Sequence, residues 1–189
     1  MNKIKFFFIF FLITIFIPIK SHSLIEVDIT RGNLNPLPIA VSPLSIDEKS
    51  KDSFKKILNK ENIGLEISSV VEKNLKTSGL FNPLNKDAFL QAPDIANLKP
   101  RFEDWNLIKA QALITGKVNF VDDKLRVEFR LWDILAAKEM MALAFTTVPD
   151  NWRRVGHIIS DKVYERLTGE KGYFDTRIIY VSEEGPKTQ

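Results

Sequence analysis

Cysteine is absent from the 189-residue sequence, and His22 and His157 are its only histidines. The lack of cysteine excludes disulfides and lipid attachment through a cysteine, and with so few histidines it excludes the usual zinc sites. The chain must therefore be held together by an ordinary hydrophobic core. At this length it can bury one.

Motifs of enzymes that bind nucleotides or use a serine nucleophile are also missing. The sequence contains no G-x-S-x-G, no Walker loop and no G-x-G-x-x-G. The run at 169–172 (Gly-Glu-Lys-Gly) follows a predicted helix instead of preceding one, so we interpret it as a linker turn. The adjacent acids Asp122–Asp123 and Glu183–Glu184 lie at predicted turns, which favours solvated carboxylates over an acid/base dyad. We expect a protein that is not an enzyme and needs no cofactor or metal.

The excess of positive charge is confined to the N-terminus. The formal net charge is +3, and Lys3, Lys5 and Lys20 lie in the first 23 residues, which hold no acid. Setting these three lysines aside leaves 24 basic residues against 24 acidic ones. A neutral chain lacks the electrostatic footprint of a nucleic-acid-binding protein.

The same N-terminus has the organisation of an export signal. Lys3 and Lys5 precede a 14-residue run from Phe6 to Ile19, interrupted only by Thr14 and Pro18. Small residues follow at Ser21 and Ser23, so we expect cleavage between Ser23 and Leu24. The run is too short for a transmembrane helix, which needs about 20 apolar residues. An uncleaved anchor is the main alternative.

Residues 24–170 are expected to form one α/β (α+β) domain. A period of two predicts a strand at 25–29, another at 39–41, and an antiparallel meander over 112–120, 125–131 and 141–145. Apolar stripes predict helices near 54–58, over 67–75 and over 155–167, the last with Asp150 or Asn151 as N-cap. Gly79 and Gly169 are expected to end the two main helices, with a short helix near Trp105. We predict a two-layer sandwich: a mixed sheet, wet on one face and covered on the other by two main helices.

Other segments are harder to interpret. The polar stretch 47–52 is expected to break the pattern, and residues 81–101, with three prolines, are expected to be mostly loop. Residues 171–189 would hold a linker and a lone strand at 177–181. The strand at 25–29 could either add to the sheet of another protein or stay docked as an edge strand, and the sequence leaves both open.

Three groups of side chains are candidates for a function. His157 is expected to lie at the boundary of the last helix in a structural role. Arg153 and Arg154 lie in the first turn of that helix, where the dipole disfavours cations, so they are either a docking or interdomain contact or a chance surface pair. The alternation of Arg126, Glu128 and Arg130 predicts a same-face ion pair on an exposed sheet surface.

Several segments, taken in their order along the chain, resemble the N-terminal domain of the TolB family of the Tol-Pal system. They are residues 25–33, 38–41, 78–81, 100–105, 110–116, 125–133, 149–154 and 164–177. The resemblance implies a periplasmic adaptor of a Gram-negative bacterium that links TolA, at the inner membrane with TolQ and TolR, to the outer-membrane lipoprotein Pal. Such an adaptor supports envelope integrity and cell division. In the family, the α/β domain precedes a six-bladed β-propeller.

The resemblance also implies a binding segment for the TolA C-terminal domain. It would consist of Leu24, Ile25, Glu26, Val27, Asp28, Ile29, Thr30, Arg31, Gly32 and Asn33. In the family, docking of this segment back onto the protein is coupled to Pal binding by the propeller. The protein is expected to be monomeric and peripheral to membranes.

Two departures from the family qualify these expectations. Residues 45–62 are longer and richer in lysine than expected, and the sequence stops at Gln189, before most of a propeller. Pal binding would then be weakened or absent, and a fragment, a truncated product and the first half of a split gene stay open. The alternatives are a small periplasmic hydrolase or envelope-ligand-binding domain that uses His157, and a non-functional remnant.

Overall fold

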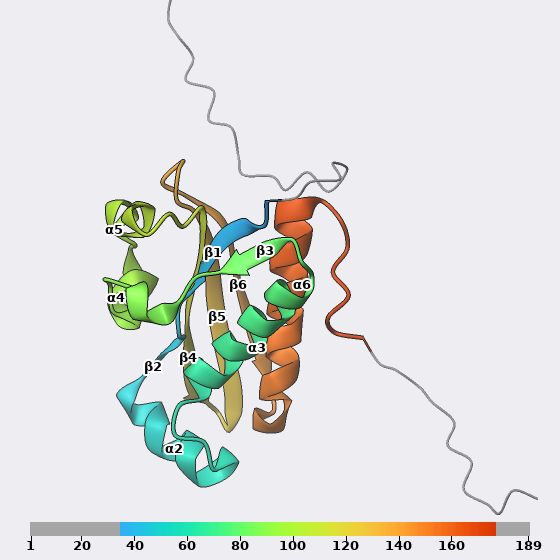
Figure 1. Ribbon diagram of the computed structural model, residues 1–189. Coiled ribbons are helices and arrows are strands. Elements are labelled where there is room, and N and C mark those ends of the chain that lie inside the picture. Colours follow the sequence, from blue (N-terminus) through green and yellow to red (C-terminus); the bar gives the residue numbers. More distant parts are fainter. Residues whose placement is uncertain (1–34, 177–189) are drawn as a thin grey trace, which may run out of the picture.

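The computed structural model describes residues 35–176 (Figure 1). The predicted signal, the strand at 25–29 and the strand at 177–181 lie outside these residues. The strands are β1 (Leu37–Val41), β2 (Ser45–Ile46), β3 (Phe81–Pro83), β4 (Ala112–Val121), β5 (Lys124–Asp133) and β6 (Lys138–Thr147). The helices are α2 (Glu48–Leu58), α3 (Ile63–Thr77), α4 (Pro93–Leu98), α5 (Phe102–Leu107) and α6 (Trp152–Thr168), with 3₁₀ turns at Lys86–Ala88 and Pro149–Asn151.

The strands form one mixed sheet in the order β3-β1-β4-β5-β6, with β2 also pairing β4. β1 runs parallel to both β3 and β4, whereas β4, β5 and β6 are antiparallel. The predicted meander and the predicted α/β class are therefore confirmed. The Asp122–Asp123 turn is confirmed too: both residues have positive φ, 48° and 59°, as a two-residue type I′ hairpin requires.

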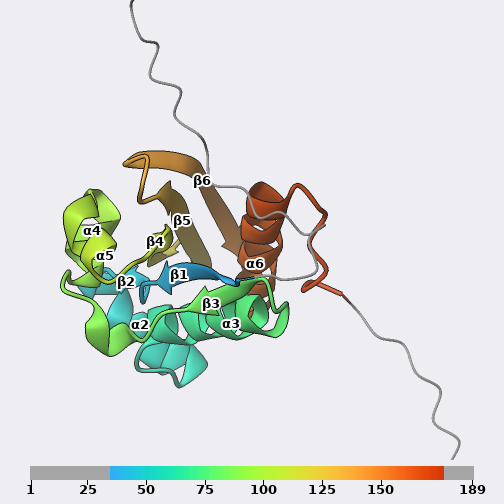
Figure 2. The same ribbon diagram turned by 45° about the horizontal axis from the view of Figure 1, so that its top comes forward.

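α3 and α6 pack side by side on one face of the sheet, as the apolar stripes predict (Figure 2). Their inward side chains join those of the strands in a large core that includes Ile67, Leu75, Phe129, Ile159 and Leu167. Gly79 and Gly169 both have positive φ after the last turns of α3 and α6. The N-terminus of α6 differs in detail from the prediction. Asn151 holds the N-cap position, but its side chain donates a hydrogen bond to Thr147 Oγ1 (3.0 Å) and does not cap the helix.

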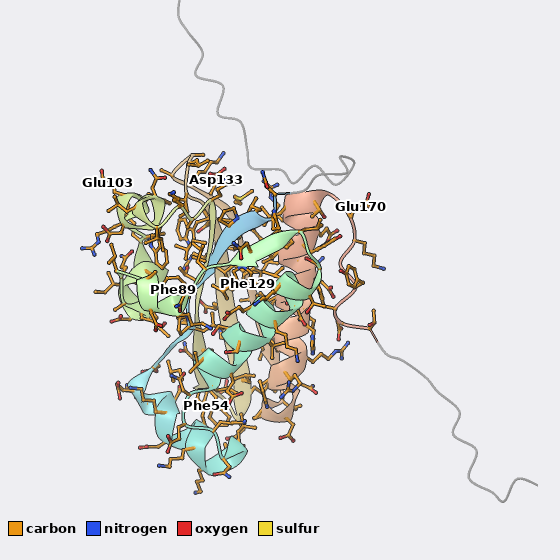
Figure 3. All side chains as sticks on the ribbon, in the orientation of Figure 1. Phe54, Phe89, Glu103, Phe129, Asp133 and Glu170 are labelled. Carbon is orange, nitrogen blue, oxygen red and sulfur yellow. The ribbon has the colours of Figure 1, made fainter. Side chains whose placement is uncertain are left out.

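The opposite face is not uniformly wet. α4 and α5 cover part of it and enclose a second, smaller core, with Phe89 near it and Phe129 on the far side of the sheet (Figure 3). This core contains Ala40, Ala96, Trp105, Ala110, Leu113, Trp132 and Ile134. The expectation that residues 81–101 are mostly loop is wrong for β3 and α4. Pro93 stands at the start of α4, where a missing N–H costs nothing.

The polar stretch at 47–52 also turns out to be helical. Asp47 Oδ1 accepts a hydrogen bond from the Lys49 N–H (3.3 Å) at the N-terminus of α2. Ser50 and Phe54 face inward while the lysines face solvent. The lysine-rich character of this segment is therefore the solvent face of an amphipathic helix, and no break in structure occurs there.

Candidate partner-binding surfaces

The predicted TolA-binding segment, residues 24–33, and the predicted cleavage site at Ser23 and Leu24 lie outside the described residues. The structure does describe the place where this segment joins the domain. The chain enters β1 at Leu37, whose N–H donates to the Leu80 carbonyl (2.9 Å). Because β1 is paired on both sides, the segment is attached to an interior strand of the sheet.

His157 lies between α3 and α6 in a structural network. Its Nδ1 is 2.9 Å from Asn74 Nδ2, which also donates to Ser160 Oγ (2.9 Å). Ser160 Oγ in turn donates to the Gly156 carbonyl (2.8 Å), so its proton is held by the backbone. These contacts join two helices and leave no serine activated by the histidine. They fit the structural role predicted for His157 and give no support to a hydrolase.

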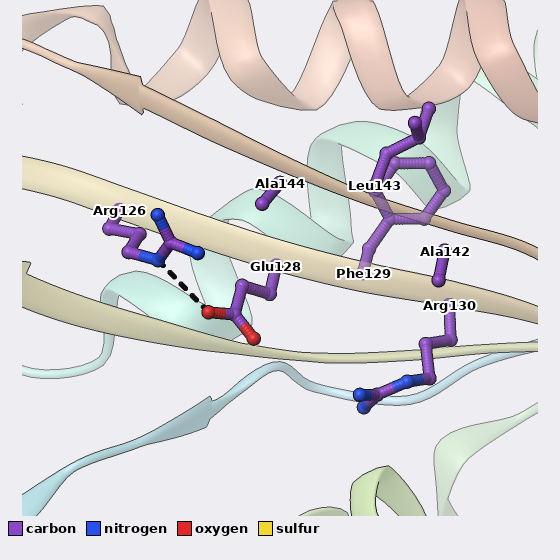
Figure 4. A pocket seen from close by; sticks show the side chains of 7 residues that line it. All are labelled: Arg126, Glu128, Phe129, Arg130, Ala142, Leu143 and Ala144. Carbon is purple, nitrogen blue, oxygen red and sulfur yellow. Dashed lines mark hydrogen bonds and ion pairs between the residues drawn. The ribbon is translucent and has the colours of Figure 1, made fainter.

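The predicted same-face ion pair is confirmed on the exposed part of the sheet (Figure 4). Arg126 Nε donates to Glu128 Oε1 (2.9 Å), and Lys117 Nζ lies 3.5 Å from the other carboxylate oxygen. Burial alone would raise the pKa of Glu128, but the hydrogen bond from Arg126 and the charges of Lys117 and Arg126 lower it. Arg130 donates to the Asn97 carbonyl at the end of α4 (3.0 Å). Arg130 Nε also lies 3.3 Å from a carboxylate oxygen of Glu139, so three cations share two carboxylates on this surface.

A shallow cavity opens beside these charges, floored by Ala142 and Ala144 of β6. A second cavity lies between β6 and α6, with Phe145, Val155 and Ile158 in its wall. A third lies between Pro43 and the segment at 89–93. None of these three cavities brings a nucleophile together with a general base. Within residues 35–176, no group of three or more histidine, aspartate or glutamate side chains is placed to hold a metal ion.

Arg153 and Arg154 play different parts. Arg153 stacks over the ring of Trp152 (4.8 Å to its centroid), with Lys60 also over that ring (5.4 Å). Arg154 binds the carboxylate of Asp175, in the segment after α6. The sequence left open a docking or interdomain contact and a chance surface pair; Arg154 pairs with Asp175 of the same chain, and a contact with another protein or domain stays a prediction. Sequence reasoning missed Asp175 and its neighbour Asp161 because no local pattern connects residues 14 positions apart.

Residues 25–140 match the TolB amino-terminal domain. The chain belongs to the TolB amino-terminal domain family. It is 82% identical over 179 residues to the Tol-Pal system protein TolB of Pelagibacter ubique (strain HTCC1062). That match covers 95% of this chain and 40% of the relative, so the chain spans about two fifths of that protein's length.

A solved TolB structure has the same fold. The crystal structure of TolB from Acinetobacter baumannii superimposes with a TM-score of 0.60 at 21% identity, covering 80% of this chain and 33% of that one. A PelC dodecamer structure from Paraburkholderia phytofirmans is a more distant match, with a TM-score of 0.43 and 16% identity over 73% of this chain and 92% of that chain. At 21% identity, the likeness to the Acinetobacter baumannii structure supports the fold alone. Among the described residues, no helix combines the length and apolarity needed to cross a bilayer.

Proposed function

We propose that the protein is a periplasmic, non-enzymatic adaptor of the Tol-Pal system that links TolA to Pal. The observation that carries this proposal is the 82% identity to a Tol-Pal system protein over almost the whole chain. The N-terminal signal pattern and the absence of surplus charge beyond it are consistent with an exported protein that recognises other proteins.

Within this proposal, residues 24–33 bind the TolA C-terminal domain by adding a strand to its sheet. Ile25, Val27 and Ile29 alternate with Glu26 and Asp28, so an extended conformation presents one apolar and one acidic face. The segment leads into β1, an interior strand. A partner that binds it is thereby connected to the middle of the sheet.

The domain organisation proposed with this role is a signal peptide at 1–23, the α/β domain at 24–170, and a linker with a first propeller strand at 171–189. Longer members, of which this chain covers about two fifths, would carry the main Pal-binding surface in the remaining part. The chain is expected to be monomeric.

The test is a calorimetric titration of the TolA C-terminal domain with the chain from Leu24 to Gln189. Deleting residues 24–33 is expected to abolish binding. Replacing Ile25, Val27 and Ile29 together by serine is expected to abolish it as well. A matched control, Glu26→Gln with Asp28→Asn, keeps the apolar face and is expected to retain binding. Undiminished binding by the deleted chain would overturn the role of this segment.

A further inference from the structure

The chain doubles back after its last helix. α6 ends at Thr168, and residues 169–176 then run alongside the same helix (Figure 1). Their backbone returns to Asp161, seven residues before Thr168, which corresponds to roughly 10 Å of helix, and the Asp175 side chain there meets Arg154. The described chain therefore ends beside the middle of α6, and only the Asp175 side chain is reached by Arg154 from the first turn of the helix.

Asp161, in the middle of α6, holds the returning segment. Its Oδ1 accepts the N–H of Phe174 (2.6 Å) and its Oδ2 accepts the N–H of Asp175 (3.1 Å). Both oxygens of one carboxylate thus bind successive backbone amides. Hydrogen bonds to an ionised acceptor are about twice as strong as neutral ones, and these two fix the direction of the backbone as well as its position.

Gly172 allows the close approach that these bonds need. A Cβ at this position would lie 2.4 Å from Asp161 Cα and 2.5 Å from its Oδ1. Since the nearest atom belongs to helix backbone, no rotamer change could relieve the clash. Any side chain at residue 172 would push the segment away from α6.

Aromatic packing and an ion pair complete the contact. The rings of Tyr173 and Phe174 meet Tyr164 edge to face, with centroids 5.5 and 5.8 Å apart. Arg154 binds both carboxylate oxygens of Asp175, with Nε–Oδ1 and Nη2–Oδ2 distances of 3.1 Å each. This ion pair is exposed, and exposed pairs contribute little to stability. Asp161 and Gly172 are therefore the decisive residues.

We propose that residues 172–175 form a strap, closed on α6 by Asp161, that determines where and in which direction the chain leaves this domain. In longer members of the family, a strap fastened in this way sets the orientation of the part that follows. That consequence rests on the proposed domain organisation, but the strap itself does not depend on any partner.

The strap can be tested by the exchange of single amides in the exported chain. NMR-detected hydrogen exchange at Phe174 and Asp175 is expected to be at least about tenfold faster in Asp161→Ala than in the unaltered protein, since both acceptors are lost. Gly172→Ala is expected to do the same through steric exclusion. Arg154→Gln is expected to have a smaller effect, and Arg153→Gln, whose guanidinium lies over Trp152, serves as the matched control with none.

A distance measurement tests the direction of the exit. Because the chain has no cysteine, Lys162→Cys with Thr176→Cys gives two unique spin-label positions, both exposed. Pulsed electron spin resonance is expected to give a narrow distance distribution, which Asp161→Ala and Gly172→Ala broaden. Unchanged exchange at residues 174 and 175 in both variants, while α6 amides stay protected, would overturn the strap. Equally broad distributions in all forms would also overturn it. TolA binding is expected to be unaffected, so failure of the strap and failure of the adaptor role are distinguishable.

Discussion

The two faces of the sheet are filled by different kinds of contact. Against α3 and α6 the core is a continuous layer of aliphatic and aromatic side chains such as Ile67 and Phe129. Against α4 and α5 the core is small, and its two tryptophans each need a polar partner. Trp105 Nε1 donates to Gln91 Oε1 (3.0 Å), and Trp132 Nε1 donates to Thr115 Oγ1 (2.9 Å). Non-directional burial dominates the first face, whereas the second also depends on particular hydrogen bonds.

The largest expected effect lies on the α3–α6 face. Phe129 is 1% exposed and its ring stacks with Phe145 at 6.1 Å. Phe129→Ala is expected to lower the free energy of unfolding by about 3–5 kcal/mol, because it leaves a cavity in a packed layer. Urea denaturation followed by circular dichroism measures it. Leu143→Ala, on the same sheet face but 38% exposed, is the matched control and should cost far less.

On the α4–α5 face, a single hydrogen-bond acceptor is expected to matter almost as much. Gln91 Oε1 accepts from both Trp105 Nε1 and the Arg101 N–H (3.0 Å). Gln91→Leu would leave the indole N–H buried without a partner, at about 1–3 kcal/mol. A double-mutant cycle of Gln91→Leu and Trp105→Phe, measured by denaturation, isolates the contribution of the hydrogen bond between the two side chains. If Gln91→Leu costs as much in a Trp105→Phe background as alone, the hydrogen bond to Trp105 is not what stabilises this face.

A smaller effect is expected at the polar link within the first face. Asn74→Ala removes the contacts to His157 and Ser160 that join α3 to α6, and is expected to cost about 1 kcal/mol. His157→Ala should cost no more than Asn74→Ala, because Ser160 keeps its bond to the Gly156 carbonyl. Thermal unfolding of the two variants checks this order. If His157→Ala lowers the stability more than Asn74→Ala does, the histidine has a structural role beyond its contact with Asn74.

The smallest effect concerns the uncovered part of the sheet. Because the pKa of Glu128 is lowered on folding, its ionised form stabilises the native state above the unfolded pKa of about 4.5, and this contribution is lost as the pH falls through the lower folded pKa. The contribution is expected to stay below about 1 kcal/mol for a surface pair. Glu128→Gln should therefore narrow the gap in unfolding free energy between pH 7 and pH 3, compared with the unaltered protein. If the difference in unfolding free energy between pH 7 and pH 3 is the same in Glu128→Gln, the ionised Glu128 does not stabilise the native state.

The same contrast explains what the sequence could and could not predict. The meander was predictable because alternation from Leu125 to Leu131 directly reports which side chains face the core. β3 was missed because Phe81–Pro83 is too short to show a period, and its pairing with β1 joins segments far apart in the chain. α4 is hidden in the sequence by Pro93, and the start of α2 by its lysines.

The contacts made by the candidate functional side chains are harder still to predict from the sequence. That Arg126 and Glu128 share a face follows from the period of two. Two other contacts depend on how a loop returns along a helix. They are the ion pair between Arg154 and Asp175 and the hydrogen bonds from the amides of residues 174 and 175 to Asp161. No spacing rule encodes such a contact. The predicted binding segment at 24–33 lies outside the described residues and stays a prediction.

The position of β1 has a mechanical consequence. A pull on the N-terminal end of β1 along the strand axis would load its hydrogen bonds to β3 and β4, which run on both flanks. A load in this direction shears both rows at once, whereas an edge strand pulled sideways opens one bond after another. The domain is thus arranged so that force entering at its N-terminus is shared across the sheet.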